Sequence, residues 1–240
     1  MIFEKLCIEA FDERSISKDI HEMNDHIKSL LINAPPSHEI PFEVLQDIRR
    51  KGGGLLESQP YSEKAENKLI NQDNKKVTIR IFNNDSPNFV YLHIHGGGHC
   101  IGAADMQDQS LEKISNDLNC VVVSVEYRLA PANPYPAAPD DCEAAAIWLI
   151  ENSMSEFNTE KIVIGGESAG ANLSAVTLQR LKSKGLLGNV KGANLIYGSY
   201  DARLTPSALR QQGSDEIFLL SYEMIRKFRD SYFQGTLDLS

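Results

Sequence analysis

The chain has few basic residues for its acidic content, and this imbalance limits its partners. Its 240 residues include 24 Lys and Arg against 33 Asp and Glu, so the formal net charge is -9 at pH 7. Phosphate backbones and anionic lipid heads call for a basic face. The composition therefore predicts no nucleic-acid partner and no membrane partner, and it favours a small neutral or apolar molecule.

Long apolar segments and paired cysteines are also absent from the sequence. No run of about 18 apolar residues could span a bilayer, and the opening MIFEKLCIEAFDER carries charges where a signal peptide needs an apolar core. The cysteines, Cys7, Cys100, Cys120 and Cys142, lack the C-x-x-C spacing of zinc sites and redox dithiols. We therefore expect a cytoplasmic protein with reduced thiols.

Short apolar runs alternate with helical segments in the middle of the chain. The expected strands are Val77–Phe82, Phe89–His95, Val121–Val125, Lys161–Ile164 and Ala193–Tyr197. The expected helices between them are Met106–Leu118, Asp141–Glu151, with an Asp cap after Pro139, and Ala169–Lys184. The later strands lack polar alternation, as parallel strands covered on both faces do. The pattern predicts an α/β fold with a mostly parallel central sheet flanked by helices.

Two amphipathic segments flank this pattern. The first covers residues 1 to about 50, where apolar residues recur every three or four positions before Pro35-Pro36. These apolar residues are Ile16, Ile20, Met23, Ile27, Leu30 and Leu31. The second lies within Asp201–Gln234. Its apolar residues are Ile217, Phe218, Leu219, Leu220, Met224, Ile225, Phe228, Tyr232 and Phe233. Such stripes are usually helix-packing surfaces.

The pentapeptide Gly166-Glu167-Ser168-Ala169-Gly170 stands between an expected strand and an expected helix. A G-x-S-x-G turn in that context strains the serine backbone and raises its hydroxyl above the carboxyl edge of the sheet. A glycine turn with a helix-capping serine is the alternative, because chance alone produces the motif in about one chain of this length in ten. The strand-to-helix context favours a nucleophile at Ser168.

A second motif, His95-Gly96-Gly97-Gly98, follows an earlier strand. Successive glycines let backbone N–H groups converge on one point, as an oxyanion hole requires. His93, His95 and His99 could instead form a zinc site, since a His-x-His pair on a strand places both rings on one face. No Asp or Glu lies among them, and we therefore expect no metal.

A third stretch carries the resemblance to a known family. Tyr127-Arg128-Leu129-Ala130-Pro131 precedes a P-x-P-A turn at Pro134–Ala137. The order HGGG, YRLAP, PxPA and GESAG, over about residues 75 to 235, resembles that of the hormone-sensitive-lipase-like esterases of the α/β-hydrolase fold. The resemblance implies that Arg128 forms a structural ion pair.

The same resemblance implies roles at the site. Ser168 would be the nucleophile, and the N–H groups of Gly97, Gly98 and Ala169 would form the oxyanion hole. His95 would hold the glycine loop. Glu167, where the family more often has Asp, would support the serine turn. His99 would stand at the mouth of the acyl pocket, where the family usually has an aromatic or apolar residue.

The domain division also follows from the resemblance. Residues 1–50 and 203–233 would form a split helical cap over the core at 51–202, and 234–240 would begin a C-terminal part whose strands and helices are missing. The expected activity is hydrolysis of short- to medium-chain acyl esters without a cofactor. A non-catalytic ligand-binding protein on the same scaffold is the alternative.

Histidine is absent after Ser168. The triad order in α/β-hydrolases is serine, acid, histidine, yet all six histidines, His21, His26, His38, His93, His95 and His99, come earlier. Asp201 is an acid that some lipase arrangements would use. We expect turnover at least about a thousandfold below that of an intact relative. We also expect an exposed edge at Ala193–Tyr197, which favours a homodimer or aggregation.

Overall fold

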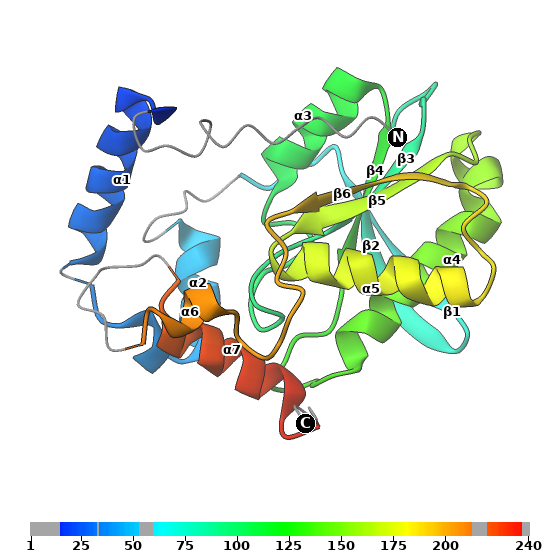
Figure 1. The fold of residues 1–240 in the computed structure, drawn as a ribbon. Helices are drawn as coiled ribbons and strands as arrows, with labels where there is room; N and C mark the ends of the chain where they lie inside the picture. Colours follow the sequence, from blue (N-terminus) through cyan, green and yellow to red (C-terminus); the bar gives the residue numbers. More distant parts are fainter. Residues whose placement is uncertain (1–14, 33, 53–59, 213–219, 237–240) are drawn as a thin grey trace.

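The computed structural model describes residues 15–32, 34–52, 60–212 and 220–236, and its centre is a six-stranded sheet (Figure 1). The strands are β1 (Glu66–Gln72), β2 (Lys75–Phe82), β3 (Val90–Ile94), β4 (Val121–Glu126), β5 (Ile162–Glu167) and β6 (Val190–Ile196). Their order is β1-β2-β4-β3-β5-β6; β4, β3, β5 and β6 run parallel, while β2 is antiparallel to both β1 and β4. This arrangement confirms the expected α/β fold.

Helices cover both faces of the sheet. The helix α3 (Asp108–Leu118) contacts β2 and β4. The helices α4 (Ala137–Phe157) and α5 (Ala169–Ser183) pack together on the opposite face (Figure 1). The two-residue period of β4 assigns its side chains to these layers. Val123 and Val125 join the larger core, whereas Val122 packs in a smaller cluster with Leu111 of α3.

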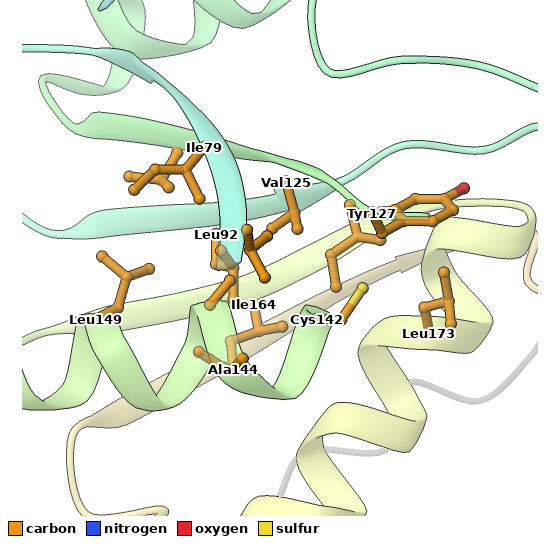
Figure 2. Packing of buried hydrophobic residues seen from close by; sticks show 14 of the residues in the cluster. Ile79, Leu92, Val125, Tyr127, Cys142, Ala144, Leu149, Ile164 and Leu173 are labelled. Atoms are coloured by element: carbon orange, nitrogen blue, oxygen red, sulfur yellow. The ribbon is translucent and has the colours of Figure 1, made fainter. Parts of the chain in front are cut away.

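The larger core explains why the apolar runs of the sequence become buried strands. Figure 2 shows Leu92 of β3 and Ile164 of β5 facing Ala144 and Leu149 of α4. Leu92, Ile164 and Leu149 are fully buried. Burying such side chains stabilises the fold by about 1.5–3 kcal/mol each. The result is a well-packed sheet. The serine turn and the glycine loop both lie at its carboxyl edge.

Two elements differ from the sequence-based expectation. The strand β1 was not expected; it pairs with β2 through a two-residue turn at Asp73 and Asn74, both with positive φ. Such a turn matches the twist of the hairpin. The helix α4 begins at Ala137 rather than at an Asp cap after Pro139, because a proline in the first turn removes no intrahelical hydrogen bond.

Five helical segments lie beside the sheet. They are α1 (Lys18–Leu31), η3 (Ser37–Glu39), α2 (Phe42–Lys51), α6 (Pro206–Leu209) and α7 (Tyr222–Phe233). Figure 1 shows α2, α6 and α7 together at one end of the sheet, with α1 farther out. α1 buries none of its residues, and Ile20 and Met23 are exposed. Residues 1–14, with Cys7, and Ile217, Phe218, Leu219 and 237–240 lie outside the described residues.

α2 is attached both to α7 and to the core. The rings of Phe42 and Phe228 stack with centroids 5.6 Å apart, and Lys227 Nζ donates a hydrogen bond to the carbonyl of Ile40. Phe42 is buried as part of the larger core. At the opposite side, β6 is the last strand of the described sheet, and residues 191–196 of it are exposed. None of the helices in the described ranges is long and apolar enough to cross a bilayer.

Candidate active site

Ser168 occupies the turn that joins β5 to α5. Its backbone has φ 54° and ψ -120°, so the strained conformation expected from the sequence is present. A Cβ on Gly166 would lie 2.0 Å from the carbonyl oxygen of Ile94, and one on Gly170 would lie 1.8 Å from the same atom. Both glycines are therefore required because the end of β3 passes directly against the turn. The Ser168 amide donates a 2.9 Å hydrogen bond to the carbonyl of Ile196.

The glycine loop that follows β3 lies beside this turn. A Cβ on Gly96 would come within 3.3 Å of the Ser168 Cβ. Gly97 and Gly98 have φ of 124° and 60°, which side-chain-bearing residues avoid. In the described part of the chain, no acceptor takes the N–H group of Gly97, Gly98 or Ala169. The fold thus brings two motifs 70 residues apart in the sequence to one edge of the sheet.

Glu167 connects the serine turn to the glycine loop. Its Oε1 accepts hydrogen bonds from the amide of Gly96 at 2.6 Å and from Nε2 of Gln107 at 3.1 Å. Its Oε2 lies 3.1 Å from Nε2 of His93, whose Nδ1 is 3.1 Å from the Ser124 hydroxyl. Burial disfavours the charged form, but the hydrogen bonds from His93 and Gly96 outweigh it and keep the pKa of Glu167 below its usual value.

His95 packs against the glycine loop, and its side chain is buried. Its Nδ1 is hydrogen-bonded to the Gly96 carbonyl at 2.9 Å, and its ring stacks on Tyr127 with a centroid distance of 4.2 Å. A Cβ on Gly102 would lie 2.5 Å from the same Nδ1. Burial lowers the pKa of His95 to about 3. The imidazole is therefore neutral at pH 7 and packed within the loop.

His99 extends the glycine loop toward α7. Its ring stacks on Tyr232 with a centroid distance of 3.9 Å, and its Nε2 is 3.4 Å from Oδ1 of Asn172. Burial lowers the pKa of His99 to about 4, so it is uncharged at pH 7. Its contacts direct the ring toward the first turns of α5 and toward α7, where Tyr232 also meets Phe233 and Tyr135.

Among the described residues, no base contacts the candidate nucleophile. Across the described ranges, no side chain hydrogen bonds to the Ser168 hydroxyl, and the three nearby imidazoles each have other partners. Asp201 instead pairs with Arg203 at 2.8 Å on the surface, and this hydrogen-bonded arginine lowers its pKa to about 2. The described residues contain no group of three or more His, Cys, Asp or Glu side chains that could hold a metal ion.

Two further contacts bear on the loops around the site. Arg128 forms the ion pair that the resemblance implies, with its Nη2 2.8 Å from Oδ1 of the buried Asp141. Gln46 of α2 was not anticipated from the sequence. Its side chain bonds both backbone groups of Gly102, at 2.9 Å and 2.6 Å, and so attaches α2 to the glycine loop. No local signal marks Gln46, because its partner is 56 residues away.

The known proteins to which this chain is similar include esterases and other ester hydrolases. The carboxylic ester hydrolase LipN of Mycobacterium tuberculosis (strain ATCC 25618 / H37Rv) is 41% identical over 92 residues, 38% of this chain and 24% of that protein. An arylesterase of Saccharolobus solfataricus is 34% identical over 139 residues, 55% of this chain and 45% of that protein. The chain therefore spans less than half the length of these relatives.

Solved structures show the same fold. A hyperthermophilic esterase from the archaeon Pyrobaculum calidifontis superposes with a TM-score of 0.77 at 24% identity, over 92% of this chain and 71% of that one. A fungal esterase from Rhizomucor miehei gives a TM-score of 0.73 at 26% identity, over 88% and 68%. A family model described as alpha/beta hydrolase fold matches residues 91–240. The chain belongs to the alpha/beta hydrolase fold family, in agreement with its resemblance to the hormone-sensitive-lipase-like esterases.

Proposed function

We propose that the chain carries the nucleophile and oxyanion hole of a serine carboxylesterase that acts on short- to medium-chain acyl esters. The observation that carries this proposal is the approach of the glycine loop to the serine turn, where the Gly96 Cβ position lies 3.3 Å from the Ser168 Cβ. An oxyanion hole must lie this close to its nucleophile, because the two act on the same carbonyl group. A capping serine would need no such neighbour.

In the proposed reaction, Ser168 Oγ attacks the ester carbonyl and passes its proton to a general base, which returns it to the departing alcohol; none of the described residues hydrogen bonds to the Ser168 hydroxyl to serve as this base. The N–H groups of Gly97, Gly98 and Ala169 donate hydrogen bonds to the negative oxygen that forms. Collapse of this intermediate expels the alcohol, and water then attacks the acyl-serine, releasing the carboxylic acid and restoring the hydroxyl. Glu167 and His95 take no proton in this scheme; they hold the loop against the turn.

A helical cap is part of the proposal. α7 lies over the glycine loop, since a Cβ on Gly98 would come within 2.3 Å of the Phe228 ring. The Phe42 ring of α2 stacks on Phe228 from the other side. These apolar side chains, from both proposed cap segments, support a cover that shields the acyl chain from water.

Labelling with a fluorophosphonate probe tests the nucleophile. We expect mass spectrometry to find the probe on Ser168, and Ser168→Ala to abolish the label. Ser183→Ala, at the exposed end of the same helix, is the matched control and should keep it. A wild-type chain that is folded but takes no label would contradict the proposal.

A ligand-binding function on the same scaffold is the second candidate. The observation in its favour is that no histidine among the described residues hydrogen bonds to Ser168. Binding of an unreactive ester analogue, unchanged by Ser168→Ala and without any labelling of the wild type, would favour this function over catalysis.

A further inference from the structure

Arg49, in the last turn of α2, reaches the glycine loop from outside the core. Its Nη1 lies 3.0 Å from the position of a Cβ on Gly97, one of the proposed oxyanion-hole residues. The guanidinium group therefore lies against the backbone of the glycine loop. It also lines a pocket of about 170 Å³, together with Arg50, Tyr61, Asp105 and Met106.

The position of Arg49 is set by the rest of α2. Gln46, one turn earlier, makes two hydrogen bonds to the backbone of Gly102. Phe42, at the start of the helix, is buried against Phe228. Because Phe42 and Gln46 are both held, α2 keeps the guanidinium group beside the glycine loop, and no carboxylate of the described residues pairs with it.

Arg49 and the next residue, Arg50, differ in their ion pairs. Arg50 forms a two-bond pair with Asp105, at 3.0 Å and 3.2 Å. Arg49 is half-buried, and within the described parts of the chain no carboxylate pairs with it. An unpaired, partly desolvated cation is unfavourable unless an anion joins it. The chain has nine more acidic than basic residues, so an arginine without a carboxylate partner is unexpected in it. Packing alone gives no reason for a positive charge at this position.

The charge of Arg49 acts on groups at the site. The pKa of His95 falls mainly through burial, and Arg49 lowers it further. The pKa of Tyr197, after the end of β6, is raised by burial and by Glu167, while Arg49 opposes the rise. These effects agree with the position of the guanidinium group beside the glycine loop.

We propose that Arg49 binds a carboxylate of the substrate, so that the site prefers monoesters of short dicarboxylic acids over neutral esters of the same size. This inference rests on the proposed esterase function. A guanidinium fork matches a carboxylate in two parallel hydrogen bonds, which are stronger than neutral ones. The neighbouring pocket gives the carboxylate space beside Arg49, while the ester carbonyl reaches Ser168.

Two unreactive ligands test this preference without turnover. N-butylsuccinamate carries a carboxylate, and N-butylsuccinamide, its primary amide, is the neutral match of nearly the same shape and has no ester bond. We expect calorimetry at pH 7 and low salt to show that the anion binds the wild-type chain about tenfold to a hundredfold more tightly. Arg49→Gln should abolish the difference, Arg49→Lys should keep part of it, and Lys51→Gln, which removes an exposed cation of α2 outside the pocket, should leave it unchanged.

The results separate this inference from the proposed function. A preference for the anion that survives Arg49→Gln, or that Lys51→Gln abolishes equally, would overturn the inference, and so would failure of the folded chain to bind either ligand. Equal weakening of both ligands by Arg49→Gln would also overturn it, in favour of a structural role. Loss of the preference in Arg49→Gln, with no fluorophosphonate label on Ser168, would refute catalysis but retain the carboxylate site.

Discussion

Glu167 accepts a 2.6 Å hydrogen bond from the backbone amide of Gly96, and so joins the residue before the candidate nucleophile to the loop that would hold the oxyanion. Glutamate is long enough to reach both this amide and His93, with one carboxylate oxygen for each. The contact gives a physical reason for a charged side chain at this position of the turn. It also makes the alignment of the two motifs depend on one carboxylate.

Replacing Glu167 should therefore slow the chemistry of Ser168 without unfolding the protein. We expect Glu167→Gln to lower the rate of fluorophosphonate labelling about tenfold to a hundredfold, because a charge-assisted hydrogen bond to the loop is lost. Glu167→Asp should restore part of the rate. Glu156→Gln, which removes a surface carboxylate paired with Lys68, is the control. Unchanged labelling in Glu167→Gln would show that the contact does not position the loop.

The strain at Ser168 should be measurable as stability. Ser168→Ala and Ser168→Gly both remove the hydroxyl, but only glycine tolerates φ 54° without strain. We expect Ser168→Gly to be about 1 kcal/mol more stable than Ser168→Ala in urea unfolding. The same pair of substitutions at Ser183, in the last turn of α5, should give the opposite order, since glycine has a lower helix propensity than alanine. Equal stabilities at position 168 would contradict the strained turn.

The buried His95 should make the protein less stable in acid. Its pKa is about 3 in the folded state, below the ordinary value near 6.5, so the unfolded chain binds more protons between these values. The free energy of unfolding should therefore fall as the pH drops through this window, by about 2 kcal/mol from pH 7 to pH 5 for this group alone.

The His95→Asn variant isolates this contribution. Asn keeps a donor for the Gly96 carbonyl but does not titrate, so urea unfolding should show a shallower loss of stability between pH 7 and pH 5. The exposed His26 on α1 provides the control His26→Asn, which should follow the wild-type curve. A variant whose slope equals that of the wild type would mean that His95 is not held neutral by burial.

The ion pair between Arg80 of β2 and Asp108 of α3 should be essential for stability. Both side chains are almost fully buried, and Arg80 Nε donates to Asp108 Oδ1 at 2.7 Å. Arg80→Met should lower the free energy of unfolding by about 3–5 kcal/mol, because it leaves a buried carboxylate unpaired. The double variant Arg80→Met with Asp108→Leu should recover part of this loss. In contrast, breaking the exposed pair of Lys113 and Asp117 should cost about 0.5 kcal/mol or less.

The sequence alone determined the strands β2 to β6, the main helices and the two glycine motifs. These features depend on local requirements: β-branched apolar runs for buried strands, and glycine or strained serine where the backbone needs positive φ or passes another chain segment. The positive φ of Ser168 follows from five consecutive residues. The Arg128 ion pair followed from the resemblance. The hairpin of β1 and β2 was open to the same local reasoning, since Asp73-Asn74 is a turn signal.

Only the tertiary structure decided which distant residues surround the two motifs. Gln46 and Arg49 come from a helix about fifty residues before the glycine loop, and their role depends on how α2 packs on Phe228 and Gly102. The contact of Glu167 with Gly96 depends on β3 and β5 being neighbours in the sheet. Contacts of this kind join residues far apart in the sequence, and they form because apolar burial outweighs the entropic cost of closing the long loop between them. No local pattern of residues is a sufficient signal for such contacts.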